Sequence, residues 1–494
     1  MCVFSGPARA THAASRWYHT EAVSIRTRAI WFVFVALQTC LFANASDNAA
    51  QDRRLDRDFQ TALSDYGSGR YTEAVSRLEG LLREVPESFE LHELLGLAYS
   101  AQSQDVKANP HFEKAVRLEP NSPAARANLA ANLSRLGKLD RAEREFKVAV
   151  KLEPHNFDAN HNLGELYVQQ GKLSAAMPFL EQAQHIDSSS YDNGYDLSLV
   201  YVLTGRAGDA RVLIRELLKQ KDTAELHNLL GQADERDGDF VAAANEYELA
   251  AHADPSESNL FDWGSELLLH RTLDPAVEVF QQATERYPKS ARLMIGLGMA
   301  LYSRGNYDDA VKALLKAADL SPSDPGCYLF LSKAYDSSPG QAEDVIERFR
   351  RFTVLQPKNA RAVYYYAMSL WKGKRAEDPT LDPHQVESLL QRAISLEPSF
   401  AEAHLQLGNL YSDERQFAIA VPEYVRALAH NADLADAHYR LGQAYVHTGQ
   451  KDRAQEQFEI YQKLRAQHLA DLDKQRAEIR QFVYSARTAR GAKP

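Results

Sequence analysis

The chain has 494 residues, of which 45% are hydrophobic, 10% aromatic and 25% charged, and these ordinary values exclude collagen-like, low-complexity and disulfide-scaffold classes. Its net charge of −10 argues against a nucleic-acid backbone as a partner, so no nucleic acid is expected to bind. Three cysteines occur, Cys2, Cys40 and Cys327, and the first two lie in a segment that we expect to be removed, so packing must supply the stability.

The first 45 residues have the pattern of a secretory signal peptide. A basic stretch ending at Arg28 precedes an apolar run over 29–45, which closes on the small residues Ala43 and Ala45. This order predicts cleavage after Ala45 and a secreted or periplasmic protein without a membrane span after cleavage. Two alternatives stay open: a membrane anchor over 29–45, which is short for a span of about 20 apolar residues, and a lipid-modified Cys40.

Cleavage at this site can be checked on the secreted protein. We expect amino-terminal sequencing to begin at Ser46, whether translation starts at Met1 or at Val23, the second of which leaves a signal peptide of ordinary length. A mature chain with intact residues before Ile30 would instead support the anchor.

An internal repeat of 33 to 35 residues fills most of the remaining chain. An alanine recurs at this interval, a glycine often stands twelve residues before it, and a proline closes most repeats. The alanines are Ala74, Ala108, Ala142, Ala176, Ala210, Ala243, Ala276, Ala310, Ala420 and Ala454. Small residues let two helices approach closely, and proline cannot continue a helix. Each repeat therefore predicts two helices that cross at the glycine and the alanine.

These repeats resemble the tetratricopeptide repeat, in which each unit is a pair of antiparallel helices. The resemblance is carried by LLGLAY at 94–99, NLGELYVQQGKLSAA at 162–176, GLGMALYSRGNYDDA at 296–310 and RLGQAYVHTGQKDRA at 440–454. It implies an all-α fold, a right-handed α-solenoid of about twelve antiparallel helix pairs.

Four segments are expected from these signals. They are a signal peptide at 1–45, a linker at 46–54, the repeat superhelix at 55–462, and a long carboxy-terminal capping helix with a basic tail at 463–494. One turn, at 373–383, carries two prolines and mixed charge, and is expected to be a lengthened exposed loop.

The sequence contains no motif of an active site. GxSxG, HExxH, CxxC pairs and phosphate-cradling glycine loops are absent, and the repeats leave no stretch long enough for a catalytic fold. Four histidines at matching repeat positions, His92, His227, His404 and His438, are spaced too far apart to share a metal and are interpreted as packing residues. We therefore expect no enzyme activity, no cofactor and no metal.

Candidate partner-binding residues lie on the first helices, which line the concave wall of a stacked array. Asn128 and Asn162 occupy matching positions in successive repeats, similar to the asparagine ladder by which the repeats of O-linked N-acetylglucosamine transferases hold a peptide backbone. A second candidate is an apolar stripe on the same wall, suited to a protein segment, although its members are equally consistent with core. Its members are Phe261, Ile295, Phe330, Tyr364 and Tyr365.

These patterns predict a non-catalytic scaffold that binds a protein or peptide segment in the groove of the array, in envelope assembly or trafficking. Two alternatives remain. One is an accessory subunit that recruits substrate to a separately encoded enzyme such as a glycosyltransferase, and the other is a self-assembling structural protein.

Overall fold

The computed structural model describes residues 45–338, 340–374 and 383–466. All regular secondary structure in these ranges is α-helical. It contains 24 helices there, the number that twelve pairs require, so the predicted all-α repeat architecture is confirmed. The chain divides into two compact units, the first closing at Asp239 and the second opening at Phe240. The signal segment up to residue 44, the carboxy-terminal segment from 467 and most of the lengthened turn lie outside the described residues.

The first unit holds α3 (Ala45–Gly67), α4 (Tyr71–Glu84), α5 (Phe89–Ala101), α6 (Asp105–Leu118), α7 (Pro123–Arg135), α8 (Leu139–Leu152), α9 (Phe157–Gln169), α10 (Leu173–Ile186), α11 (Tyr191–Leu203), α12 (Ala207–Gln220) and α13 (Ala224–Asp237). The second unit holds α14 (Phe240–Ala253), α15 (Glu257–Leu269), α16 (Leu273–Arg286), α17 (Ala291–Arg304), α18 (Tyr307–Leu320), α19 (Pro325–Ser337), α20 (Ala342–Leu355), α21 (Ala360–Lys374), α22 (Pro383–Leu396), α23 (Ala401–Asp413), α24 (Phe417–His430), α25 (Ala435–His447) and α26 (Lys451–Ala466).

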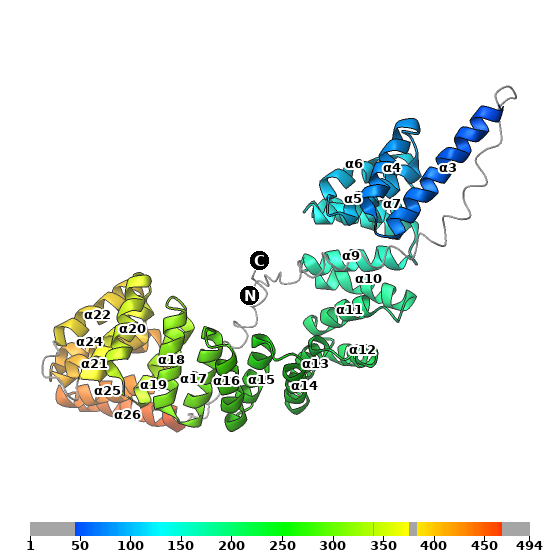
Figure 1. Cartoon of the computed structure of the whole chain (residues 1–494). Helices are drawn as coiled ribbons and strands as arrows, with labels where there is room; N and C mark the ends of the chain where they lie inside the picture. The colour runs from blue at the N-terminus through cyan, green and yellow to red at the C-terminus, as the bar shows by residue number, and fades with distance from the viewer. Residues whose placement is uncertain (1–44, 339, 375–382, 467–494) are drawn as a thin grey trace. The chain divides into compact units, whose positions relative to one another are not determined.

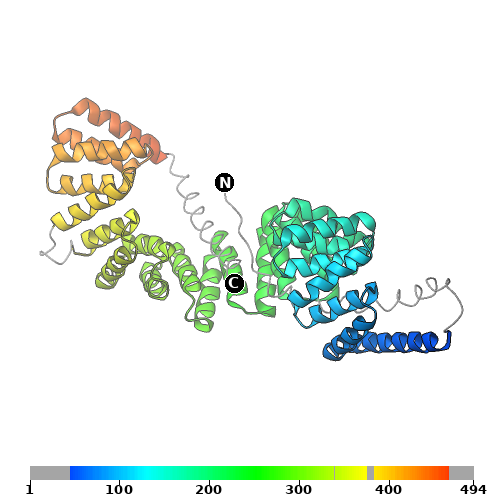
Figure 2. The same ribbon diagram turned by 90° about the horizontal axis from the view of Figure 1, so that it is seen from above.

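Within each unit, consecutive helices run back and forth as stacked hairpins (Figures 1 and 2). The first helix of a pair also contacts the first helix of the next pair, as α5 does with α7 and α15 with α17. Second helices approach one another less, and α18 with α20 is the main exception. The first helices therefore form the tighter layer of each stack, where side chains of successive pairs come together.

The small residue of the first helix lies against a large side chain of the second helix. A Cβ atom at Gly164 would lie 2.6 Å from Cγ of Leu180, and one at Gly408 would lie 2.7 Å from Cε1 of Tyr424. Leu180 and Tyr424 are fully buried, and each stands four residues after the repeated alanine. The glycine is thus required because the two helices touch at that point.

Left-handed backbone closes the tight turn between the helices of a pair. Gly137, between α7 and α8, has a φ of 71°, a region that glycine enters without cost. Ser103, Arg271, Gln341 and Arg415 adopt the same conformation in other turns, with φ between 58° and 62°. Each of these non-glycine residues costs about 1 kcal/mol or more of backbone strain, so the tight turn does not depend on glycine alone.

The predicted linker at 46–54 is wrong, because these residues belong to α3, which begins at Ala45 and continues to Gly67. Alanine, arginine and glutamine are good helix formers, and no glycine or proline interrupts the segment. The first pair therefore starts about ten residues earlier than the repeat pattern indicated.

Substituting the small residue tests this packing. We expect Gly164→Ala to lower the free energy of unfolding by about 1–3 kcal/mol, since the new methyl group would overlap the buried Leu180 side chain. Chemical denaturation followed by circular dichroism measures the change. Gly80→Ala in α4 is the matched control, because no atom lies within 4 Å of its Cβ position, and it should gain about 0.5–1 kcal/mol. Equal losses in both variants would contradict the packing argument.

Candidate functional site

The two predicted asparagines lie on successive first helices but differ in their surroundings. Asn128 on α7 donates a hydrogen bond to the carboxylate of Glu93 on α5. Asn162 on α9 is half-buried, and no residue in the described part of the chain hydrogen-bonds its side-chain amide. Asn162 is therefore the one of the two whose amide is available to a peptide backbone, which offers both donors and acceptors.

The apolar stripe lies inside the core of the second unit. Phe261 and Ile295 are 0% and 1% exposed, and Phe330 is also buried. The Phe261 ring lies 6.1 Å from the ring of Phe280 on α16, and the Arg292 guanidinium of α17 covers it at 4.5 Å. The stripe is corrected accordingly: these side chains fill space between helices and leave no surface on which a partner could dock.

The two tyrosines of the stripe are also packing residues. Tyr365 is buried, with its ring 5.6 Å from that of Phe349 on α20. The ring of Tyr364, which is half-buried, lies 5.0 Å from the ring of Phe400, and the side chain packs against three clusters of buried hydrophobic residues. Burial raises the pKa of the Tyr364 hydroxyl, in keeping with its enclosed position.

An acidic face was missed by sequence reasoning. We define it as Asp158 and Glu165 on α9 with Asp192 and Asp196 on α11. These two neighbouring first helices carry no lysine or arginine, and Asn162 lies between Asp158 and Glu165 at the spacing of one helix face. The signal that the sequence offered was this absence of lysine and arginine from two successive first helices.

Within the acidic face, the charges of Asp196 and Asp192 act on Glu165. Burial raises the pKa of Glu165 to about 7, and the charge of Asp196 adds to this shift. His161 opposes the shift; its ring stacks on Phe157 and its Nδ1 lies 3.2 Å from Oδ1 of Asn193. A carboxylate whose charge is disfavoured in the free protein gains more than an ordinary one from an approaching cation. The acidic face is thus suited to the side chain of lysine or arginine.

The histidine ladder belongs to a recurring bridge. In four pairs, the residue four positions before the small residue makes two side-chain contacts. One is to a backbone carbonyl in the preceding turn, six residues earlier in the chain. The other is to a side chain on the second helix of the same pair, nineteen residues later. The four bridges are His92 with Pro86 and His111, Arg126 with Pro120 and Glu145, His404 with Pro398 and Glu423, and His438 with Ala432 and Gln457. Three of the four ladder histidines therefore join a turn to a helix pair, which confirms their interpretation as packing residues. His227 instead contacts Asp222, with 2.9 Å between Nε2 and Oδ1.

The metal-ligating and nucleophilic side chains of the described residues were compared with the requirements of a metal or catalytic site. Among the described residues, no three His, Cys, Asp or Glu side chains are grouped as metal ligands. Cys327 is buried, its Sγ lies 3.0 Å from the carbonyl oxygen of Asp324, and burial raises the pKa of its thiol, which makes it unreactive.

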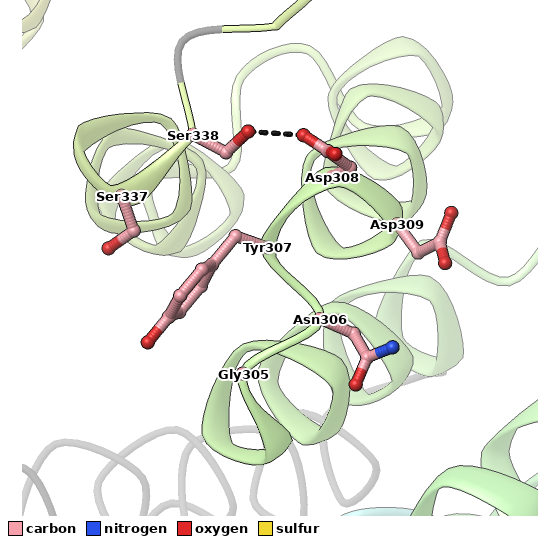
Figure 3. Close-up of a pocket in the computed structure, with 7 residues that line it drawn as sticks. All are labelled: Gly305, Asn306, Tyr307, Asp308, Asp309, Ser337 and Ser338. Carbon is pink, nitrogen blue, oxygen red and sulfur yellow. Dashed lines mark hydrogen bonds between the residues drawn. The ribbon is translucent and has the colours of Figure 1, made fainter.

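A shallow recess of about 280 Å³ lies where the turn between α17 and α18 meets the end of α19 (Figure 3). Its lining consists of Gly305, Asn306, Tyr307, Asp308, Asp309, Ser337 and Ser338. Ser338 donates a hydrogen bond to Asp308 across the recess (Figure 3). Small-molecule sites are lined mostly by apolar side chains, and this polar recess lacks such a lining.

The stacked helix pairs, many of which cross at a small residue, define a helical repeat protein. The chain belongs to the tetratricopeptide repeat family: models of this repeat match residues 59–123, 261–325 and 405–468, 135–191 and 167–233, and 123–146, more than half of the chain. Tetratricopeptide repeats indicate a scaffold for protein interactions.

Similar proteins match only part of this chain. The human protein O-mannosyl-transferase TMTC3 is 25% identical over 202 residues, which are 39% of this chain and 20% of that protein. The TPR repeat-containing protein YpiA of Bacillus subtilis strain 168 is 25% identical over 187 residues, 38% of this chain and 42% of that protein. The chain thus spans less than half the length of either relative.

Solved structures give partial alignments. A chain from the structure of Naa15/Naa10 bound to HypK-THB aligns over 82% of this chain and 68% of its own length, with 16% identity and a TM-score of 0.35. Pseudomonas aeruginosa PilF aligns over 41% and 93%, with 20% identity and a TM-score of 0.34. At these scores the likeness supports no functional inference. Within the described ranges, no helix has the length and apolar character needed to span a membrane.

The bridge between His92 and His111 predicts a pH-dependent stability. Their Nδ1 atoms lie 3.1 Å apart, and burial, with the charge of His92, lowers the pKa of His111, while Glu79 acts in the opposite direction. Unfolded histidine has a pKa of about 6.5, so the unfolded chain binds the proton first and stability falls as the pH decreases below that value. We expect His111→Gln to lose less stability than the wild type between pH 7.5 and 5.5 in denaturation experiments. Parallel pH profiles would contradict this.

Proposed function

We propose that this chain is a non-catalytic scaffold that holds an extended protein segment against the first helices of its first unit, with lysine or arginine side chains of that segment on the acidic face. The observation that carries the proposal is the set of four carboxylates on α9 and α11, two neighbouring helices without lysine or arginine, beside the unused amide of Asn162. The repeat family supports a protein as the partner.

In this proposal the bound segment is recognised through two kinds of contact, one to its backbone and one to its charged side chains. Asn162 offers a donor and an acceptor to the peptide backbone, which is the same for any sequence. The acidic face selects the charge of the segment and steers its approach. Asn128 takes part only if its hydrogen bond to Glu93 is exchanged for one to the partner.

The setting is part of the same proposal. A signal peptide at 1–45 would take the repeats to the envelope, where assembly or trafficking complexes need extended binding surfaces. Repeats through residue 462 and a capping segment at 463–494 remain the proposed organisation of the rest of the chain.

A second candidate is an accessory subunit that presents substrate to a separately encoded enzyme such as a glycosyltransferase. The similarity to an O-mannosyl-transferase favours it, over 20% of that protein's length. Mixing the chain with a glycosyltransferase from the same organism and measuring turnover of a protein substrate distinguishes this role: an accessory subunit raises the rate, whereas a scaffold with another partner leaves it unchanged.

Binding of a defined peptide tests the acidic face. The probe is a fluorescent twelve-residue peptide of alternating lysine and serine, measured by anisotropy at low salt. We expect Glu165→Gln with Asp196→Asn to weaken binding about tenfold at pH 8, equal to about 1.4 kcal/mol. Because a cation favours the charged carboxylate and the pKa of Glu165 is about 7, wild-type affinity should rise between pH 6 and 8.

The control variant removes the same number of negative charges, but from helices outside the acidic face. Glu73→Gln with Asp140→Asn removes two exposed carboxylates from the second helices α4 and α8, and should leave affinity nearly unchanged. Equal weakening in both variants would show unspecific attraction to an acidic protein and would contradict a defined site. A peptide of alternating glutamate and serine should not bind.

A further inference from the structure

A buried amide between α10 and α11 can take only one orientation. Asn193, in the first turn of α11, is 0% exposed, and its Nδ2 donates hydrogen bonds to the carbonyl oxygen of Leu180 at 3.0 Å and to Oε1 of Gln184 at 2.8 Å. Gln184 is oriented in turn, because its Nε2 donates to the carbonyl oxygen of Ser188 at 3.1 Å. A reversed Asn193 amide would place its oxygen against two acceptors, so Oδ1 is the atom that faces α9.

The orientation of this amide determines where His161 carries its proton. Nδ1 of His161, on α9, lies 3.2 Å from Oδ1 of Asn193, and an amide oxygen can only accept a hydrogen bond. Nδ1 is therefore protonated in both the neutral and the charged ring, so this hydrogen bond persists when the ring changes its charge. The lone pair of the neutral ring is then on Nε2, which no residue in the described ranges hydrogen-bonds. The half-buried ring is held further by stacking on Phe157, at 5.6 Å.

His161 lies among the carboxylates of the acidic face. It follows Asp158 by three residues and precedes Glu165 by four, which places all three on one side of α9. Burial raises the pKa of Asp158, and the charge of His161 opposes this shift, as it does at Glu165. A proton on His161 is therefore felt by both carboxylates.

The other cations around α9 are balanced or lie elsewhere. Arg126 and Arg135 of α7 are ion-paired with Glu145 and Asp105, and Lys147 of α8 is ion-paired with Glu143. The remaining charged groups to consider are Glu153 in the turn before α9, Glu181 and the exposed His185 on α10, and Asp192 and Asp196 on α11. Histidine is the side chain that gains positive charge between about pH 8 and 5, so a new cation on this wall would arise at His161.

We propose that Asn193 positions His161 as a pH-dependent contact of the acidic face, an inference that rests on the proposed function. At neutral pH, Nε2 accepts a hydrogen bond from a lysine or arginine side chain of the bound segment. At acidic pH, Nε2 gains a proton, and the ring becomes a cation that repels the same side chain. Because the hydrogen bond to Asn193 is the same in both states, the segment is released without local unfolding.

Nuclear magnetic resonance of the chain alone tests where the proton lies. With isotope-labelled histidine nitrogens, we expect the spectrum at pH 8 to show His161 with a protonated Nδ1 and an unprotonated Nε2. Loss of this signal in His161→Gln assigns it. A protonated Nε2 at pH 8 would overturn the proposal, whether or not any segment binds.

Binding of the fluorescent lysine and serine peptide tests the pH dependence. Its lysines stay charged throughout, since their pKa is about 10.4. Glu165→Gln is the starting variant, because it removes the carboxylate whose pKa is about 7. We expect its affinity to fall about threefold from pH 8 to pH 5.5. Adding His161→Gln should remove most of this decrease, because glutamine can still donate to Asn193 but gains no charge.

The matched control adds His185→Gln to Glu165→Gln. It removes an exposed histidine from the second helix α10, outside the acidic face, and should leave the threefold decrease as it was. Circular dichroism checks that each variant is folded. An equal decrease with and without His161 would overturn this inference and leave the acidic face supported, whereas a peptide that does not bind the wild type at pH 8 would contradict the proposed function and the pH-dependent contact together.

Discussion

The close approach of two helices at one small residue is the constraint on which the rest of this structure depends. Where Gly164 meets Leu180, or Gly408 meets Tyr424, no atom can be added without moving a buried side chain. The crossing point fixes how the second helix lies on the first. Repeated along the chain, it sets how successive first helices meet, and so which of their side chains lie together in the inner layer.

The crossing could be predicted from the sequence because it is local and periodic. The small residue, the alanine twelve positions later and the large residue four beyond it all belong to one pair, and they recur often enough to be recognised. Burial could not be predicted in this way. Phe261 and Tyr439 hold the same position in their pairs, yet one is fully buried and the other is partly exposed, because only the first has a following pair within the described residues. The prediction that the apolar stripe forms a binding surface was wrong for the same reason, because neighbouring helices bury its side chains.

The acidic face depends on distances that a linear pattern does not contain. Asp192 and Asp196 are about thirty residues from Glu165, and their effect on its charge arises only when α9 and α11 pack together. The asparagine positions, in contrast, were placed correctly on the first helices, although the bond from Asn128 to Glu93 was not foreseeable. The start of α3 was missed because residues 45–54 have helical composition but no repeat signal.

The bridges at the fourth position before the small residue have a consequence for how such an array can change length. One partner of each bridge is a main-chain carbonyl that any preceding turn provides, and the other lies within the same pair, as Glu423 does for His404. Duplicating, deleting or transplanting a pair would therefore leave these bridges intact, whereas a bond between neighbouring pairs, such as that from Asn128 to Glu93, would be lost. In these four pairs the bridging side chains differ while the connection to the preceding turn stays the same, so this connection sets no limit on the number of pairs.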